Sequence, residues 1–425
     1  MLFNPRRGDR EHSRRPGVVV APARRRAAMG RALACLLAAA APAALAQGPV
    51  TLSLEEARGL AEQHAPEVLA ARGRVEEAEG GRAGAGLWLP SNPVLQVDGR
   101  TSGSLGLGAA ANLTVALEPF GAPASRAREA ERRLDTSRAD EALTRLEARL
   151  AVTAAYVGTG LARLEAKAVE QSIALAERLL AAAREREKAG AGSAVDVTSA
   201  QAELASRQAE LLAARAAEAL DELTLRELTG LPPGGALALS TSIEAPGPAP
   251  RGTPGRSLDL KASDARLEQL AATQERLERE VRPRVGLVGQ VDAAPASPVF
   301  GAVGLALELP VAQRNQGPRA VNAAAQRAEH ARRAVVERHL ALALVHRTAA
   351  HDAAAGQLEV LTRQGIPVAA ERLRLVEEGF RAGRFDVFKV TAAANDLVQL
   401  ETRRLDALRR LWTERLALER LQGGF

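Results

Sequence analysis

The sequence predicts a mainly α-helical protein built from two tandem repeats, each of which also supplies a pair of β-strands suited to a membrane. Three observations support this prediction. A short turn sequence occurs twice, long stretches repeat leucine at heptad spacing, and short stretches alternate apolar with polar residues. The two copies of the turn are "KAGAGSAVDVTSAQAEL" (188–204) and "RAGRFDVFKVTAAANDL" (381–397), which align without gaps at an offset of 193 (381 − 188).

Residues 1–46 are interpreted as a leader that contains a signal peptide. They hold nine Arg, one Asp and one Glu, a net charge of +7, so the rest of the chain carries 6 − 7 = −1. This near-neutral remainder argues against nucleic acid as a partner. The apolar run after Arg31, "ALACLLAAAAPAALA", ends in a small-x-small cleavage pattern ahead of Gln47. Met29 is an alternative start, in which case residues 1–28 are not part of the protein.

Two other interpretations of the leader stay open. Ser13-Arg14-Arg15 resembles a twin-Arg export signal, although its apolar run lies far downstream. "RALAC", which ends at Cys35, resembles a lipoprotein acylation box, although the apolar stretch follows the cysteine. The general export pathway fits the pattern best. Since Cys35 is the single cysteine, its removal with the leader leaves a cysteine-free chain, which suits an oxidising compartment.

Residues 47–230 form the first predicted repeat. A helix is expected from Leu52, with Ser53 as a candidate N-cap and acidic residues in the first turn. Two strands are then expected, because the apolar positions Leu95, Val97, Leu107, Leu113, Val115 and Leu117 alternate with the polar positions Gln96, Asp98, Asn112, Thr114 and Glu118. A long helix over 123–189 follows, whose leucines suit a coiled-coil seam.

Residues 257–425 form the second predicted repeat, after a Pro- and Gly-rich stretch, 231–256, that is interpreted as a linker. The second repeat has the same order as the first: a helix over 258–281, two alternating stretches and a long helical pattern. Arg126-Ala127 and Arg319-Ala320 align at the same offset of 193, so the similarity extends beyond the turn.

The length of the helices restricts the architecture. A helix of about 65 residues spans on the order of 100 Å, which no compact core can enclose, so it must lie in a coiled coil, a bundle or a tube. The alternating stretches match transmembrane β-strands in length, about 9–11 residues. Four strands cannot close a barrel, and lipid does not tolerate open sheet edges. If these strands lie in a membrane, several chains must therefore share one barrel.

Taken together, these features resemble the outer membrane efflux proteins of the TolC-like family, over essentially the whole chain after the leader. Three segments carry the resemblance: "LSLEEARGLAEQHAPEV" (52–68), "LELPVAQRNQGPRAVNAAAQ" (307–326) and "GIPVAAERLRLVEEGFRAGRFDV" (365–387). Their most specific parts are the "RNQG" and "GFRAG" runs. Within the family, the chain is most similar to the cobalt-zinc-cadmium (CzcC-like) efflux outer membrane components.

The resemblance implies a homotrimer in the outer membrane with a large periplasmic portion. Each repeat would contribute one β-hairpin to a shared, twelve-stranded barrel and long helices to a periplasmic α-helical barrel. The implied function is that of an exit duct in a tripartite efflux system, which passively conducts substrates such as heavy-metal cations to the exterior. The implied partners are outer membrane lipid, a periplasmic adaptor (membrane fusion) protein and an inner-membrane pump of the RND type.

The repeated turn would then form the periplasmic tips of two helical hairpins. In relatives these tips form the gate and meet the adaptor, and glycine supplies the tight reversal. The corresponding residues are Gly190, Ser193, Asp196 and Val197 in the first tip, and Gly383, Arg384, Asp386 and Lys389 in the second.

The second tip departs from the family pattern. Relatives carry Asp six and nine residues after the second glycine, whereas this chain has Lys389 and Ala392 there. Asp196 holds the equivalent place in the first tip, so we hypothesise a salt bridge between Asp196 and Lys389 across the closed mouth, worth about 0.2–1 kcal/mol. Single-channel conductance tests it: Lys389→Asp should destabilise the closed state, and adding Asp196→Lys should restore it. Equal conductance of the single and double variants would refute the pair.

The alternation also assigns faces to the strands. Leu113, Val115, Leu305 and Leu307 are expected to face lipid, and Asn112, Thr114 and Gln290 the lumen of the barrel.

The sequence contains no motif typical of an enzyme, and we expect no catalytic residue, cofactor or metal site. His330, His339, His346 and His351 lie on one predicted helix without the i, i+4 spacing that places two imidazoles on one face. Two alternatives to a channel stay open. A soluble coiled-coil scaffold would not need the alternating strands, and a periplasmic adaptor would carry one helical hairpin rather than two.

Overall fold

The computed structural model describes residues 50–101, 106–247, 257–293 and 298–423. The predicted leader, with Met29 and Cys35, lies outside the described residues, as does part of the predicted linker. The first half of the described chain contains β1 (Val50–Leu52), α2 (Leu54–His64), α3 (Pro66–Ala85), β2 (Val94–Thr101), β3 (Leu107–Leu117), α4 (Ala122–Lys188) and α5 (Ala194–Thr229). The second half contains β4 (Leu237–Leu239), α6 (Leu258–Arg279), β5 (Arg284–Ala293), β6 (Phe300–Glu308), α7 (Gln316–Val360), a π-helical turn (Leu361–Gly365), α8 (Ile366–Arg381) and α9 (Val387–Gln422).

The first helical region differs from the prediction at its start and in its middle. Ser53 is the N-cap, but Leu52 belongs to β1, so the helix begins at Leu54. Ser53 and Glu56 form a capping box, and the hydrogen bond from the Ser53 backbone N–H lowers the pKa of the Glu56 carboxyl. The helix then breaks between α2 and α3, because Ala65 precedes Pro66 and takes an extended conformation (ψ 128°).

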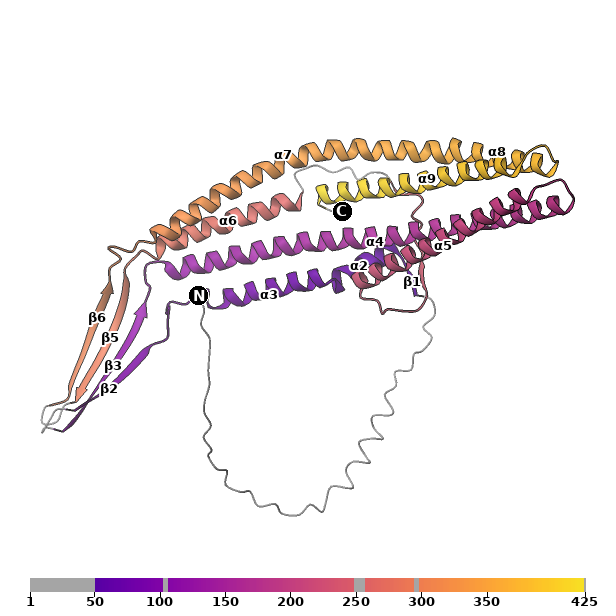
Figure 1. Ribbon diagram of the computed structural model, residues 1–425. Coiled ribbons are helices and arrows are strands. Elements are labelled where there is room, and N and C mark those ends of the chain that lie inside the picture. Colours follow the sequence, from indigo (N-terminus) through magenta and orange to yellow (C-terminus); the bar gives the residue numbers. More distant parts are fainter. Residues whose placement is uncertain (1–49, 102–105, 248–256, 294–297, 424–425) are drawn as a thin grey trace, which may run out of the picture. The chain divides into compact units, whose positions relative to one another are not determined.

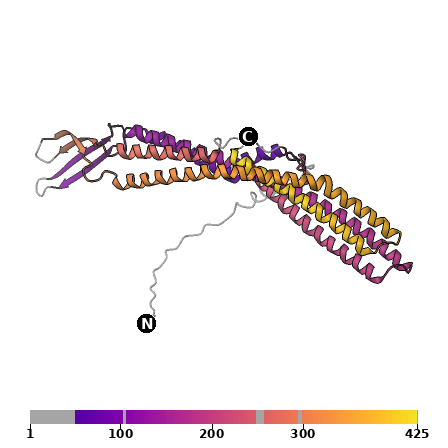
Figure 2. The same ribbon diagram turned by 90° about the horizontal axis from the view of Figure 1, so that it is seen from above.

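Four helices lie side by side in the order α3, α4, α6, α7, and the four long strands continue from one end of them (Figures 1 and 2). At the opposite end, α4 and α5 form one hairpin, and α8 and α9 form a second hairpin beside it (Figure 1). Among the described residues, no helix combines the length and the apolar composition needed to cross a membrane. Side-chain contacts join each neighbouring pair of the four helices: Arg138–Glu79 (3.0 Å) for α4 and α3, Arg128–Glu275 (2.6 Å) for α4 and α6, and Asn322 to the Leu270 carbonyl (3.0 Å) for α7 and α6.

The long strands form one antiparallel sheet in the order β2-β3-β5-β6. Residues that lie directly opposite each other in such a sheet share a face, and consecutive residues alternate between faces. β2 and β6 are the edge strands of this sheet in the single chain. Because the number of strands is even, the two edge strands run in opposite directions.

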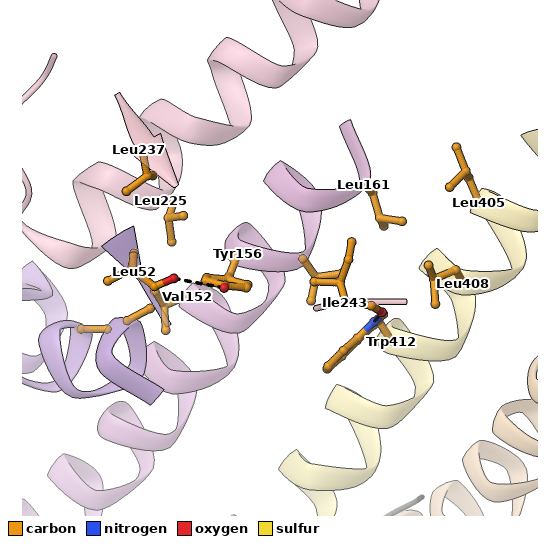
Figure 3. Packing of buried hydrophobic residues seen from close by; sticks show 13 residues of the cluster. Leu52, Val152, Tyr156, Leu161, Leu225, Leu237, Ile243, Leu405, Leu408 and Trp412 are labelled. Atoms are coloured by element: carbon orange, nitrogen blue, oxygen red, sulfur yellow. Dashed lines mark hydrogen bonds between the residues drawn. The ribbon is translucent and has the colours of Figure 1, made fainter. Parts of the chain in front are cut away.

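A second, two-stranded sheet is absent from the prediction. β1 pairs in parallel with β4, which lies inside the stretch interpreted as a linker. This small sheet closes the main apolar core, in which Tyr156 is fully buried and its hydroxyl group lies 3.1 Å from the Leu52 carbonyl (Figure 3).

The chain after β4 also packs into this core. The Trp412 ring nitrogen donates to the Ile243 carbonyl at 2.9 Å, and both side chains are 6 % exposed (Figure 3). Gly160 on α4 makes room for Ile243, because a β-carbon at position 160 would lie 2.8 Å from the Cδ1 atom of Ile243. The segment between the two halves is therefore a packed part of the fold in its described portion.

Candidate functional site

The two hairpin tips have the same backbone turn. Gly190 and Gly383 take left-handed conformations, with φ 69° and φ 76°. In the first tip, the Ala191 N–H donates to the Arg186 carbonyl at 2.9 Å, and in the second the Arg384 N–H donates to the Gly379 carbonyl at 2.8 Å. Each bond closes a six-residue loop of the Schellman type, in which glycine is favoured at the left-handed position.

The next residues start the outgoing helices. Ser193 caps α5 together with Asp196: the Ser193 N–H donates to the Asp196 carboxylate at 3.0 Å, and the Asp196 N–H donates to the Ser193 hydroxyl at 3.2 Å. Asp386 caps α9 by accepting from the Lys389 N–H at 2.9 Å. Three of the side chains singled out in the sequence, those of Ser193, Asp196 and Asp386, thus shape the tips through capping.

The hypothesised salt bridge is not formed within the described single chain. Asp196 is engaged in its capping box, and the Lys389 ammonium group lies 4.7 Å from the centre of the Phe385 ring. A bridge between Asp196 and Lys389 of neighbouring chains stays a prediction, and it would compete with both contacts.

Val197 has a packing position. It is 9 % exposed and lies in a small apolar cluster with Leu180, Ala183 and Ala200. Its side chain therefore holds α4 against α5 and offers little surface to a partner. The large apolar residues that are exposed at the tips are instead Val195 (60 %) and Phe388 (54 %), which stand at equivalent positions 193 residues apart.

Gly379 and Phe385 also shape the second tip, a role that the sequence did not indicate. A β-carbon at Gly379 would overlap with the Phe385 ring, so the glycine is required for that ring to pack. The equivalent residues of the first tip, Arg186 and Gly192, have the opposite arrangement, with the large residue on the incoming helix. Aligning the two turns reveals this exchange of large and small residues, although it does not reveal the contact.

The sheet separates the two sets of residues that alternation assigned to opposite faces. Asn112 lies opposite both Gln96 and Gln290, and Thr114 is two residues further along the same face. The other face carries the apolar set in three rows, which are Leu113–Gly289–Val303, Val115–Leu287–Leu305 and Leu117–Val285–Leu307. It stays a prediction that the polar face lines a lumen and that the apolar face meets lipid.

An ionic cluster marks the junction of sheet and helices. Glu118 follows β3, is 4 % exposed, and its carboxylate contacts Arg126 of α4 and lies 3.0 Å from the Nε atom of Arg284. Arg284 also lies 3.8 Å from Glu308 at the end of β6. Arg126 further donates to the Leu87 carbonyl at 3.0 Å. The cluster thus fixes β3, β5 and β6 to the start of α4.

The described residues contain no group of three or more His, Cys, Asp or Glu side chains that could hold a metal ion. His351 is 7 % exposed and its Nδ1 atom lies 3.3 Å from Asp352. A single buried imidazole of this kind is a packing feature of α7 and gives no basis for catalysis or metal binding.

Residues 57–231 match the family model described as outer membrane efflux protein. A comparison with curated protein sequences finds no match.

Solved structures share the fold over most of the chain. The outer membrane protein VceC from Vibrio cholerae has a TM-score of 0.72 at 18 % identity, over 87 % of this chain and 96 % of VceC. The MtrE outer membrane channel of Neisseria gonorrhoeae, solved in its open state, has a TM-score of 0.73 at 16 % identity, over 87 % and 89 % of the two chains. CusC, whose structures concern folding and transmembrane channel formation, has a TM-score of 0.73 at 15 % identity, over 88 % and 92 %. The described chain therefore has the fold of solved outer membrane channels, and its residues 57–231 match the outer membrane efflux protein family.

Proposed function

We propose that the protein is the outer membrane exit duct of a tripartite efflux system. Three copies would join their sheets into one twelve-stranded barrel, and their helices would extend the tube through the periplasm to the hairpin tips. There the tips would meet a periplasmic adaptor protein, which links the duct to an inner-membrane pump of the RND type. The protein would act as a passive conduit and carry out no chemical reaction.

The observation that carries this proposal is the open, four-stranded sheet with one apolar face. Leu305 and Val303 are 77 % and 82 % exposed in the single chain, and Leu95 is 65 % exposed. A water-soluble scaffold would not present a contiguous apolar sheet face of this kind. The antiparallel relation of the edge strands β2 and β6 lets identical copies pair edge to edge, which removes the open edges that lipid does not tolerate.

The experiment combines membrane fractionation with a mass measurement and a conductance measurement. We expect the processed protein to begin at Gln47, to fractionate with the outer membrane as a homotrimer, and to conduct ions across planar bilayers. A soluble monomer without conductance would contradict the proposal.

The exported substances are proposed to include heavy-metal cations, because the sequence resembles the cobalt-zinc-cadmium group most. Loss of the gene should then increase sensitivity to cobalt, zinc or cadmium ions more than sensitivity to organic drugs. The reverse order would assign the duct to drug efflux and leave its function as an exit duct intact.

A further inference from the structure

Arg186, at the end of α4, contacts both hairpin tips. Its guanidinium group donates to the Phe385 carbonyl at 3.2 Å and to the Phe380 carbonyl at 3.4 Å, both in the second hairpin. It also donates to the Ala191 carbonyl of its own tip at 3.2 Å. The guanidinium carbon lies 4.7 Å from the centre of the Phe380 ring, which is 4 % exposed. One side chain therefore binds three backbone carbonyls and an aromatic face.

The position of Arg186 on α4 is that of a seam residue. Leu175, Leu179 and Ala182 pack against the apolar cluster of the second hairpin, and Arg186 continues their spacing of four, three and four residues. An apolar residue is the ordinary choice at such a position. A single polar residue in a coiled-coil seam fixes the register of the helices and lowers their stability.

The acceptors of Arg186 suit a role in register. The Phe385 carbonyl belongs to the turn just before the N-cap Asp386, and the Phe380 carbonyl also accepts from the Gly383 N–H at 3.0 Å within the Schellman turn. Both oxygens are thus fixed at the very end of the second hairpin. The planar, forked guanidinium group matches fixed acceptors in one geometry. A shift of one helical turn, about 5.4 Å, would break both bonds.

We propose that Arg186 is a positioning residue that sets the axial register of the two hairpins, so that both tips end at the same height. The second hairpin has no equivalent residue, because Gly379 stands at that position and leaves room for Phe385. Each chain therefore has one such contact, which runs from the first hairpin to the second. The functional consequence of this register rests on the proposed function: aligned tips would present a single, composite surface to the adaptor.

The test measures the distance between the tips directly. Spin labels are placed at Lys188 and Arg381, the exposed last residues of α4 and α8, in the full chain with Cys35→Ser and diluted with unlabelled protein. Arg186→Met keeps a long side chain but places an apolar group in the seam. We expect the main distance to shift by about one helical turn, on the order of 5 Å, or to split into two populations, without a lower melting temperature.

Arg184→Met is the matched control, because Arg184 is an exposed residue of the same helix, two positions earlier. Its distance distribution should equal that of the parent. Should Arg186→Met fail to fold, Arg186→Lys serves instead: one ammonium group reaches fewer carbonyls than the forked guanidinium, so the distribution should be broader than in the parent.

A distribution for the folded variant that equals that of the parent overturns the inference, even if its melting temperature falls, since the contact would then be merely structural. The readout does not depend on conductance. If the parent protein forms no channel but the distance shifts as expected, the proposed function fails while the role of Arg186 in register stands.

Discussion

Leu305→Arg is expected to prevent assembly of the proposed barrel in the outer membrane. Leu305 stands near the middle of β6, opposite Leu287, which in turn stands opposite Val115, so the substitution would place a charge within an apolar row. An arginine on the lipid face of a barrel costs about 2–4 kcal/mol near the bilayer midplane. In a trimer this cost occurs three times. The amount of heat-resistant trimer in the outer membrane fraction is the measurement.

Ala306→Arg and Thr114→Arg are the matched controls. Ala306 follows Leu305 in the same strand, so its depth is similar, but it lies opposite Gly286 on the polar face. Thr114 lies on that face in β3. Both variants should assemble at nearly the level of the parent, because the lumen of a barrel is polar. Equal loss of trimer in Leu305→Arg and Ala306→Arg would show that the two faces do not differ in environment.

The sequence predicted which residues share a face of the sheet, and it predicted the turns at the tips, because the causes of both features are local. Strict alternation determines which residues share a face of a sheet, so the separation of Leu113 from Asn112 followed from their positions alone. The tips were predictable for a similar reason. Gly190 and Gly383 adopt positive φ angles, and the N-cap residue, Ser193 or Asp386, follows three residues later, so each tip is determined within one short segment.

The remaining features depend on contacts between distant parts of the chain. β1 and β4 are three residues each and pair across 187 positions (237 − 50), which no local pattern indicates. The contact between Ile243 and Trp412 is also distant in sequence, so no local pattern indicates it. The Pro and Gly content of the stretch before Ile243 is instead typical of a linker. Arg186 resembled any charged residue at the end of a long helix until its acceptors in the second hairpin were known.

Glu118 is the clearest case of a residue whose role the sequence concealed. In the alternating pattern it was one more polar residue on the face of Asn112 and Thr114. The structure buries its carboxylate between Arg126 and Arg284, at the point where the sheet gives way to the helices. Its exposed fraction of 4 % depends on segments more than 150 residues apart (284 − 118 = 166), which the alternating pattern does not report.

Glu118→Gln is expected to lower the free energy of unfolding by about 3 kcal/mol, near the low end of the range for removing one partner of a buried ion pair. The low end applies because the Arg284 side chain is 44 % exposed and Arg126 keeps its bond to the Leu87 carbonyl. Glu308→Gln is the control: the Glu308 side chain is 70 % exposed and 3.8 Å from Arg284, so its loss should cost no more than about 1 kcal/mol. Thermal unfolding followed by circular dichroism measures both.

Adding Arg284→Gln to Glu118→Gln should recover part of the loss, because it removes a cation left without its buried partner. If Glu118→Gln unfolds at the same temperature as Glu308→Gln, the buried carboxylate does not hold the sheet to the helices.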